Sequence, residues 1–204
     1  MPALKSRGSC RGFAIHQNRT VVFESHLELM VMFLFAIRPD VAEIIDQPAS
    51  VSFIDRDGKL RRHTFDFLII LAGGLKIFIA VKPEKRVAQS GIRQTISLIA
   101  EQLAPGIADQ IALITDRDFT RADRFNAQQA FECARFPIPE HDDLIDRMTE
   151  NMIGSAKIAD LVDTSGLGGM GFRAVVRLLA RRVLAPTQPS RRITPDSYVV
   201  RRTS

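Results

Sequence analysis

Three charged residues stand in otherwise apolar surroundings, where their types and spacing suggest chemistry. Asp66 lies within an apolar segment that reads as a strand, Lys82 ends the next such segment, and Glu24 precedes a run with helical spacing. A charge removed from water is costly unless it is paired or bound to a metal ion. Two explanations remain open at this point: a structural ion pair between Asp66 and Lys82, or a functional site at one edge of a sheet.

The helix that would position Glu24 is indicated by hydrophobic spacing. Apolar residues between Phe23 and Ile37 recur at intervals of three and four, which is typical of one buried helical face. Ser25 and Glu28 predict a capping box, so the helix is expected to begin at Ser25 and to leave Glu24 at its mouth. The residues before Thr20 are polar, and we expect them to be loosely held.

The strands that would carry Asp66 and Lys82 follow directly. Short apolar segments at 41–45 and 51–54 precede Asp57-Gly58, a hairpin signal, and a single returning strand is expected over 60–71. Gly73-Gly74 predicts a second tight turn before a strand at 75–81. The expected product is a three-stranded antiparallel meander.

Beyond the meander the pattern becomes helical. The spacing predicts helices over 87–103, 120–135, 142–153 and 171–184, with one short buried strand at 111–114. The predicted fold class is therefore α/β, with a core of helix, three-stranded meander, helix and strand, followed by a helical C-terminal extension.

Four motifs occur in order along this predicted core. They are Glu24, then Gln47-Pro48, then His63-Thr64-Phe65-Asp66-Phe67-Leu68, then Ile79-Ala80-Val81-Lys82-Pro83-Glu84. Together they resemble the core of PD-(D/E)XK nucleases and, more narrowly, the TnsA family, the endonuclease subunit of heteromeric transposases. The resemblance covers about residues 20–115. It implies a restriction-endonuclease-like nuclease domain at 14–137 and a helical, arginine-rich C-terminal region at 138–204.

The resemblance also implies roles for particular residues. Glu24, Asp66 and Lys82 would be catalytic, and Glu24, Asp66 and the backbone carbonyl of Val81 would hold Mg²⁺ or Mn²⁺. Such an ion neutralises the scissile phosphate and lowers the pKa of a water nucleophile, and hard oxygen ligands suit it. The implied partners are DNA, a DDE transposase subunit and an ATPase regulator.

The sequence departs from the family pattern at the centre of the motif. Ala80 stands two residues before Lys82, where the family has Glu, Asp or Gln, and an alanine methyl cannot bind a cation. Phe65 replaces the proline that precedes the catalytic aspartate in the family. Glu84, beyond Lys82, and Gln94, on the following helix, are the candidate replacements for the missing ligand.

The charge distribution indicates where nucleic acid would bind. The chain has a formal net charge of +5, but residues 87–164 are acidic, with 7 basic and 13 acidic side chains. Residues 165–204 carry 8 arginines and a single acid, Asp196. Basic clusters bind phosphate, so DNA contacts are expected at these positions. The candidates are Lys85, Arg86, Arg173, Arg177, Arg181 and Arg182.

Three functions are consistent with these observations. The first is a TnsA-like endonuclease that cuts at transposon ends, and the second is a non-catalytic descendant of the same fold that binds DNA or assembles the transposition complex. The third is a stand-alone nuclease of a defence or phage-derived system. The longest apolar runs fall short of the roughly 18 residues of a membrane span, and no secretory signal is recognisable, so a cytoplasmic location without membrane contact is expected.

Overall fold

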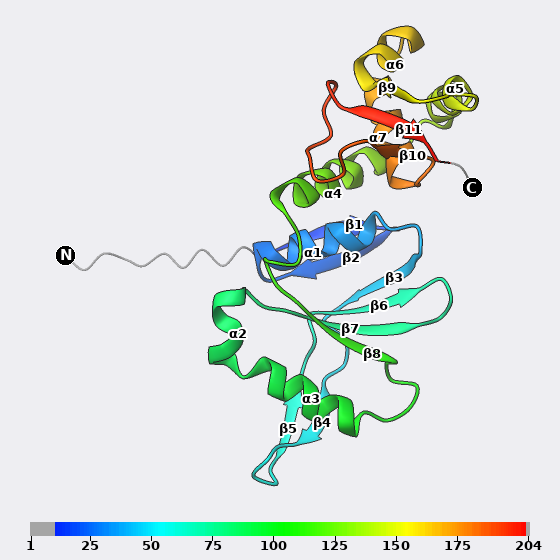
Figure 1. Cartoon of the computed structure of the whole chain (residues 1–204). Coiled ribbons are helices and arrows are strands. Elements are labelled where there is room, and N and C mark those ends of the chain that lie inside the picture. Colours follow the sequence, from blue (N-terminus) through cyan, green and yellow to red (C-terminus); the bar gives the residue numbers. More distant parts are fainter. Residues whose placement is uncertain (1–10, 203–204) are drawn as a thin grey trace, which may run out of the picture. The chain divides into compact units, whose positions relative to one another are not determined.

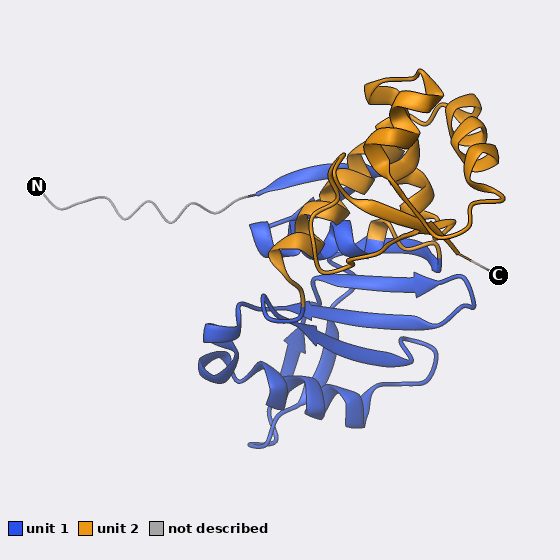
Figure 2. Cartoon of the chain, turned by 45° about the horizontal axis from the view of Figure 1, so that its top comes forward, with its two compact units in different colours: residues 1–35, 40–118 blue, residues 36–39, 119–204 orange. Residues whose placement is uncertain are grey.

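The computed structural model describes residues 11–202 and divides into two compact units. Unit 1 contains the described residues up to Phe35 together with Asp40–Asp118, and unit 2 contains Ala36–Pro39 and the described residues from Phe119 onward (Figure 2). The boundary lies earlier than the sequence predicted, at 118/119 rather than at 137/138. The reason is that helix α4 (Arg121–Ala134) buries Ala130 and Cys133 in the core of unit 2.

Unit 1 is built on a four-stranded mixed sheet with the order β3-β6-β7-β8 (Figure 1). Strand β6 (Phe67–Leu71) pairs antiparallel with both β3 (Val41–Asp46) and β7 (Lys76–Val81), and β8 (Gln110–Ile114) runs parallel to β7. Parallel neighbours need a crossover connection, which helices α2 (Glu84–Ser90) and α3 (Ile92–Gln102) supply. The fold is thus mixed α/β, as expected.

The expected single strand over 60–71 is wrong. Its first part is β5 (Leu60–His63), which pairs only with β4 (Val51–Ile54) in a separate two-stranded ribbon, and its last part is β6 in the main sheet. The chain leaves strand geometry between them, at 64–66. The meander of the main sheet is therefore β3, β6 and β7, and the ribbon is an insertion between β3 and β6.

Helix α1 (His26–Ala36) begins as the sequence predicted. The Ser25 hydroxyl accepts the Glu28 N–H at 3.2 Å, which is one half of a capping box, whereas the Glu28 carboxylate accepts the N–H of Glu24, the residue before the cap, at 2.7 Å. The predicted helix over 87–103 is instead two helices, because Gly91 adopts a left-handed φ of 64° that interrupts the helical path between α2 and α3.

The expectation of a loose N-terminal segment is wrong for the part that the structure describes. Strands β1 (Gly12–His16) and β2 (Arg19–Phe23) form an antiparallel hairpin in unit 1. Gln17 and Asn18 connect them with φ angles of 47° and 60°, the left-handed pair that suits a two-residue hairpin turn. The remainder of that prediction, residues 1–10, lies outside the described residues.

Unit 2 is not purely helical, which corrects the prediction for the C-terminal region. Around the buried helix α7 (Gly169–Ala180) it places further helices and a small antiparallel sheet with the order β10-β11-β9. The core residues come from both kinds of element and include Ile145, Val175 and Val199. The other elements are α5 (Pro139–Thr149), β9 (Ser155–Lys157), α6 (Ile158–Ser165), β10 (Leu184–Pro186) and β11 (Tyr198–Arg201).

A buried ion pair joins two helices of unit 2. The Arg177 side chain is 3% exposed, and its Nε and Nη2 donate to the Asp142 carboxylate at 2.8 and 2.5 Å. Its Nη1 donates to the Cys133 carbonyl at 3.2 Å, and Arg181 reaches the second Asp142 oxygen at 3.0 Å. Arg177 thereby links α7, α5 and α4.

No helix within residues 11–202 has the length and apolar character needed to cross a bilayer.

Removing one member of this buried pair is expected to be costly, because Asp142 would keep its charge in the interior. Arg177→Met should lower the free energy of unfolding of unit 2 by about 3 kcal/mol in urea denaturation. The exposed Arg182→Met is the control and should change it little. The double variant Arg177→Met/Asp142→Leu should recover most of the loss. Equal effects of the two single variants would contradict this role for Arg177.

Candidate functional site

Asp66 is fixed where the ribbon returns to the main sheet. Its carboxylate oxygen Oδ2 accepts the Val81 N–H at 2.6 Å, and its own N–H donates to the Ile79 carbonyl at 3.0 Å. Its carbonyl accepts the N–H of Gln47, a residue in the left-handed conformation, at 3.0 Å. The Asp66 side chain is therefore hydrogen-bonded to Val81, the last residue of β7, which directly precedes Lys82.

The environment of Asp66 favours its protonated form. Burial is the main cause, and it raises the pKa of Asp66 to about 6. The Val81 hydrogen bond and the charge of Lys82 act in the opposite direction, whereas the negative charge of Glu28 raises the pKa further. Near pH 7 this carboxylate is ionised although it is partly shielded from water, and a charge in such surroundings favours the binding of a cation.

The helix acid that acts on Asp66 is Glu28, whereas the sequence pointed to Glu24. The Glu24 side chain is half exposed and lies 3.5 Å from the Arg11 guanidinium. Glu28 is one helical turn further on, and its charge is felt at Asp66 while its oxygens accept the Ser25 hydroxyl and the Glu24 N–H. Sequence reasoning assigned Glu28 to the cap alone, and because Glu24 precedes the first residue of the helix, helical spacing gave no signal that linked Glu28 to Asp66.

Lys82 and His63 complete the group around Asp66. Lys82 is half-buried just after β7, and its charge acts on both Asp66 and His63. No salt bridge joins Lys82 to Asp66 within residues 11–202, so the purely structural ion pair is not formed there. Burial, with a smaller effect of Lys82, lowers the pKa of His63, which is therefore neutral near pH 7. Its buried Nε2 has no hydrogen-bond partner among the described residues.

Ala80 is buried in an apolar cluster. Its side chain is 2% exposed, it is paired with Leu113 of β8, and it belongs to the same buried cluster as Phe65 and Phe78. Phe65 stacks on Phe78 with ring centroids 4.5 Å apart. The two departures from the family pattern, Phe65 and Ala80, thus occur together in one packed interior.

The candidate replacement ligands lie at a different hollow. Glu84 and Gln94 both line a recess of about 360 Å³ beside Arg93, but Asp66 and Lys82 are not among its lining residues. The Glu84 N–H donates to the Asp116 carboxylate at 2.7 Å. The contact with Asp116 holds the first turn of helix α2. It does not bring Glu84 into the group around Asp66.

The residues present suit a weakly held Mg²⁺ better than a preformed metal centre. In the part of the chain that the structure describes, no three His, Cys, Asp or Glu side chains come together in a way that could hold a metal ion. Mg²⁺, however, is commonly bound by one or two carboxylates, with waters and substrate phosphates as the remaining ligands. Asp66, on whose pKa the charge of Glu28 acts, fits this second arrangement as one such carboxylate.

The predicted DNA-binding residues divide into two groups. Lys85, Arg86, Arg181 and Arg182 are exposed. Arg173 is partly buried and donates to the Glu132 carbonyl at 3.0 Å. The predicted DNA contact of Arg177 is wrong, because its buried guanidinium is paired with Asp142 and cannot reach a phosphate. The row of arginines at every fourth residue is therefore not one solvent-facing stripe.

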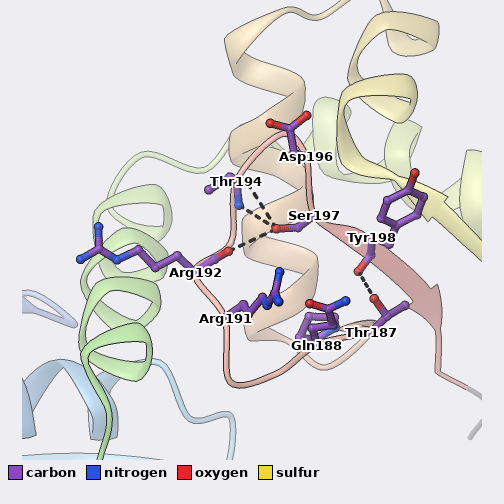
Figure 3. Close-up of a pocket in the computed structure, with 9 residues that line it drawn as sticks. Thr187, Gln188, Arg191, Arg192, Thr194, Asp196, Ser197 and Tyr198 are labelled. Carbon is purple, nitrogen blue, oxygen red and sulfur yellow. Dashed lines mark hydrogen bonds between the residues drawn. The ribbon is translucent and has the colours of Figure 1, made fainter.

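A loop in unit 2 encloses a second hollow, of about 300 Å³ (Figure 3). The Ser197 hydroxyl donates to the Arg192 carbonyl at 3.2 Å and accepts the Thr194 N–H at 3.0 Å. The Arg192 guanidinium extends away from the hollow and lies 4.9 Å from the centre of the Phe125 ring. These groups serve the loop and its packing on α4, which is a structural role.

The sequence matches no protein-family model, and a search of curated proteins finds no match. The proposed function therefore rests on the residues around Asp66.

The raised pKa of Asp66 predicts a specific dependence of stability on pH. Because the folded protein holds this proton more tightly than the unfolded chain, the contribution is complete below about pH 4 and is lost as the pH rises through 6. Asp66→Asn keeps an acceptor for the Val81 N–H and has no charge to bury. Relative to the wild type, its free energy of unfolding should rise between pH 4 and pH 8 by up to about 3 kcal/mol. A constant difference across that range would contradict the burial of this charge.

Proposed function

We propose that this chain is a metal-dependent DNA endonuclease that resembles the TnsA family and cuts at transposon ends. The observation that supports it most is the group of charged residues at the end of β7. Burial raises the pKa of Asp66 to about 6, and the charges of Glu28 and Lys82 act on the same carboxyl group. Perturbed carboxylates beside a lysine are typical of catalytic sites.

The order of elements in unit 1 supports the finer fold assignment. A helix precedes three antiparallel strands of the sheet, and crossover helices then lead to a parallel fourth strand. That is the order implied by a restriction-endonuclease-like core. The ribbon of β4 and β5 is an insertion in it.

Each residue of the group has a role in this proposal. Asp66 would hold the ion through the carboxylate that the Val81 N–H orients, with Glu28 as the second acid, and Lys82 would bind a phosphate oxygen. His63, whose Nε2 is buried, would hold the ribbon beside this group through its contact with Phe65. A bound Mg²⁺ would supply charge neutralisation and a more acidic water. Because the protein offers few ligands, DNA phosphates would complete the coordination.

The partners follow from the same proposal. A TnsA-like subunit would act with a DDE transposase subunit and an ATPase regulator on DNA, and its own nuclease activity would depend on that assembly. A gene for a transposase beside the gene for this chain would support this assignment over a stand-alone nuclease.

One observation favours a second candidate, a non-catalytic protein of the same fold that binds DNA or assembles the complex. Ala80 is packed in an apolar cluster where the family pattern has a metal ligand. On this alternative the fold and the basic surfaces remain, but metal-dependent cleavage is lost.

Supercoiled plasmid nicking with Mn²⁺ or Mg²⁺, in the presence of the partner transposase, separates the two candidates. The wild type should nick only with metal, and Lys82→Ala should lower the rate by about 10²-fold or more. Glu28→Gln should lower it at least about tenfold, whereas the matched variant Glu24→Gln should leave it unchanged. DNA binding without any metal-dependent nicking would overturn the endonuclease and favour the non-catalytic candidate. Loss of activity in Glu24→Gln alone would show that the wrong helix acid has been chosen.

A further inference from the structure

The ribbon of β4 and β5 in unit 1 has one bare face. Val51 and Phe53 point inward and are buried in the apolar cluster that contains Phe65. The opposite face carries the cross-strand pairs Ser52–Arg62 and Ile54–Leu60, and all four of these residues are exposed. Leu60 is 70% and Ile54 44% exposed, an unusual pair of aliphatic side chains to leave in water at a hairpin end.

The turn of the ribbon is rigid, and it leaves positive charge exposed. The Asp55 carboxylate accepts the Lys59 N–H at 2.9 Å and the Arg61 Nε at 2.8 Å, and these bonds hold its pKa below the usual value. Gly58, with a φ of 75°, allows the tight reversal. Arg61 is thereby neutralised within the ribbon. The cations that remain are Arg56, Lys59 and Arg62, against the single acid Asp57.

Helix α3 clamps the open edge of the ribbon. The Gln102 amide accepts the Ile54 N–H at 2.8 Å and donates to the Ile54 carbonyl at 3.0 Å. A partner strand therefore cannot pair with the backbone at this position. The surface available to a partner is therefore made of side chains at the tip of the ribbon, where the aliphatic side chains of Ile54 and Leu60 are flanked by cations.

The ribbon is also continuous with the candidate site. His63 ends β5, and Phe65, which is 1% exposed, packs edge to face with His63 at 4.7 Å and stacks on Phe78 of β7. Asp66 follows directly. A ligand on the ribbon would thus be linked to the Asp66 carboxylate by a short segment that packs against β7.

We propose that the outer face of this ribbon, formed by Ser52, Ile54, Leu60 and Arg62 with Lys59 and Arg56 at the turn, is a contact surface for duplex DNA. A two-stranded ribbon fits the major groove, where arginine pairs with guanine and aliphatic side chains contact the thymine methyl group. The lysine and arginine at the turn reach phosphates. Two exposed aliphatic residues are far too few for a stable protein interface, and the excess of cations favours an anionic partner.

The inference rests on the proposed function for the choice of DNA, and the test keeps the two separable. Binding of the full-length protein to a short fluorescent duplex is measured by anisotropy without metal over a series of salt concentrations. Lys59→Gln should reduce the slope of log Kobs against log salt by about 0.9, the loss of one phosphate contact. The double variant Ile54→Ser/Leu60→Ser should weaken binding about tenfold with an unchanged slope, because it removes apolar contacts alone.

Matched controls identify the ribbon as the cause. Ile153, 99% exposed in unit 2, gives Ile153→Ser as a control that should bind like the wild type. Circular dichroism verifies that the variants fold. Unchanged affinity in the ribbon variants overturns the inference even if the protein nicks DNA, whereas weakened binding supports it even if no nicking occurs. Binding to anionic phosphatidylserine vesicles through Ile54 and Leu60, with no change in DNA binding, would also overturn it.

Discussion

Unit 1 holds one carboxylate, that of Asp66, largely out of water where the chain returns from the ribbon to the sheet. The Val81 N–H, at the end of β7, has the Asp66 side chain as its acceptor, so the hydrogen bond that closes this corner is charged rather than neutral. Burial opposes that charge and raises the pKa of Asp66 to about 6. A neutral acceptor would satisfy the same N–H at lower cost, so stability alone does not account for an aspartate at this position.

The surroundings of this corner explain why so few metal ligands are present. Phe65 and Ala80, beside Asp66 and Lys82 in the sequence, both belong to the apolar cluster that also takes in the inner face of the ribbon. A carboxylate at Ala80 would be desolvated in that cluster. Ala80 therefore contributes to the packing between ribbon and sheet and offers no ligand. In the proposed function, DNA phosphates and water would therefore have to supply most of the ligands of a metal ion.

Local sequence patterns correctly predicted the elements that depend on neighbouring residues. They failed for features that depend on contacts between residues far apart in the sequence. The helix start at Ser25 and the tight turn at Gly73-Gly74 that leads into β7 are local and are confirmed. The break at 64–66 was missed because the alternation continues through it, and only the contact with Val81 reveals it. Arg177 was assigned to DNA from its spacing, but its partner Asp142 lies 35 residues away. Glu28 was missed because one visible role, the cap, concealed its effect on Asp66.

The most direct test of the central claim is to locate a bound Mn²⁺ by its paramagnetic broadening of backbone amide signals, with duplex DNA present. The Val81 N–H donates to the Asp66 carboxylate, so an ion held there must broaden the Val81 signal strongly. We expect selective broadening at Val81 in the wild type and its loss in Asp66→Asn. Equal broadening in the two proteins, or none at Val81 at millimolar Mn²⁺, would contradict a metal site at Asp66.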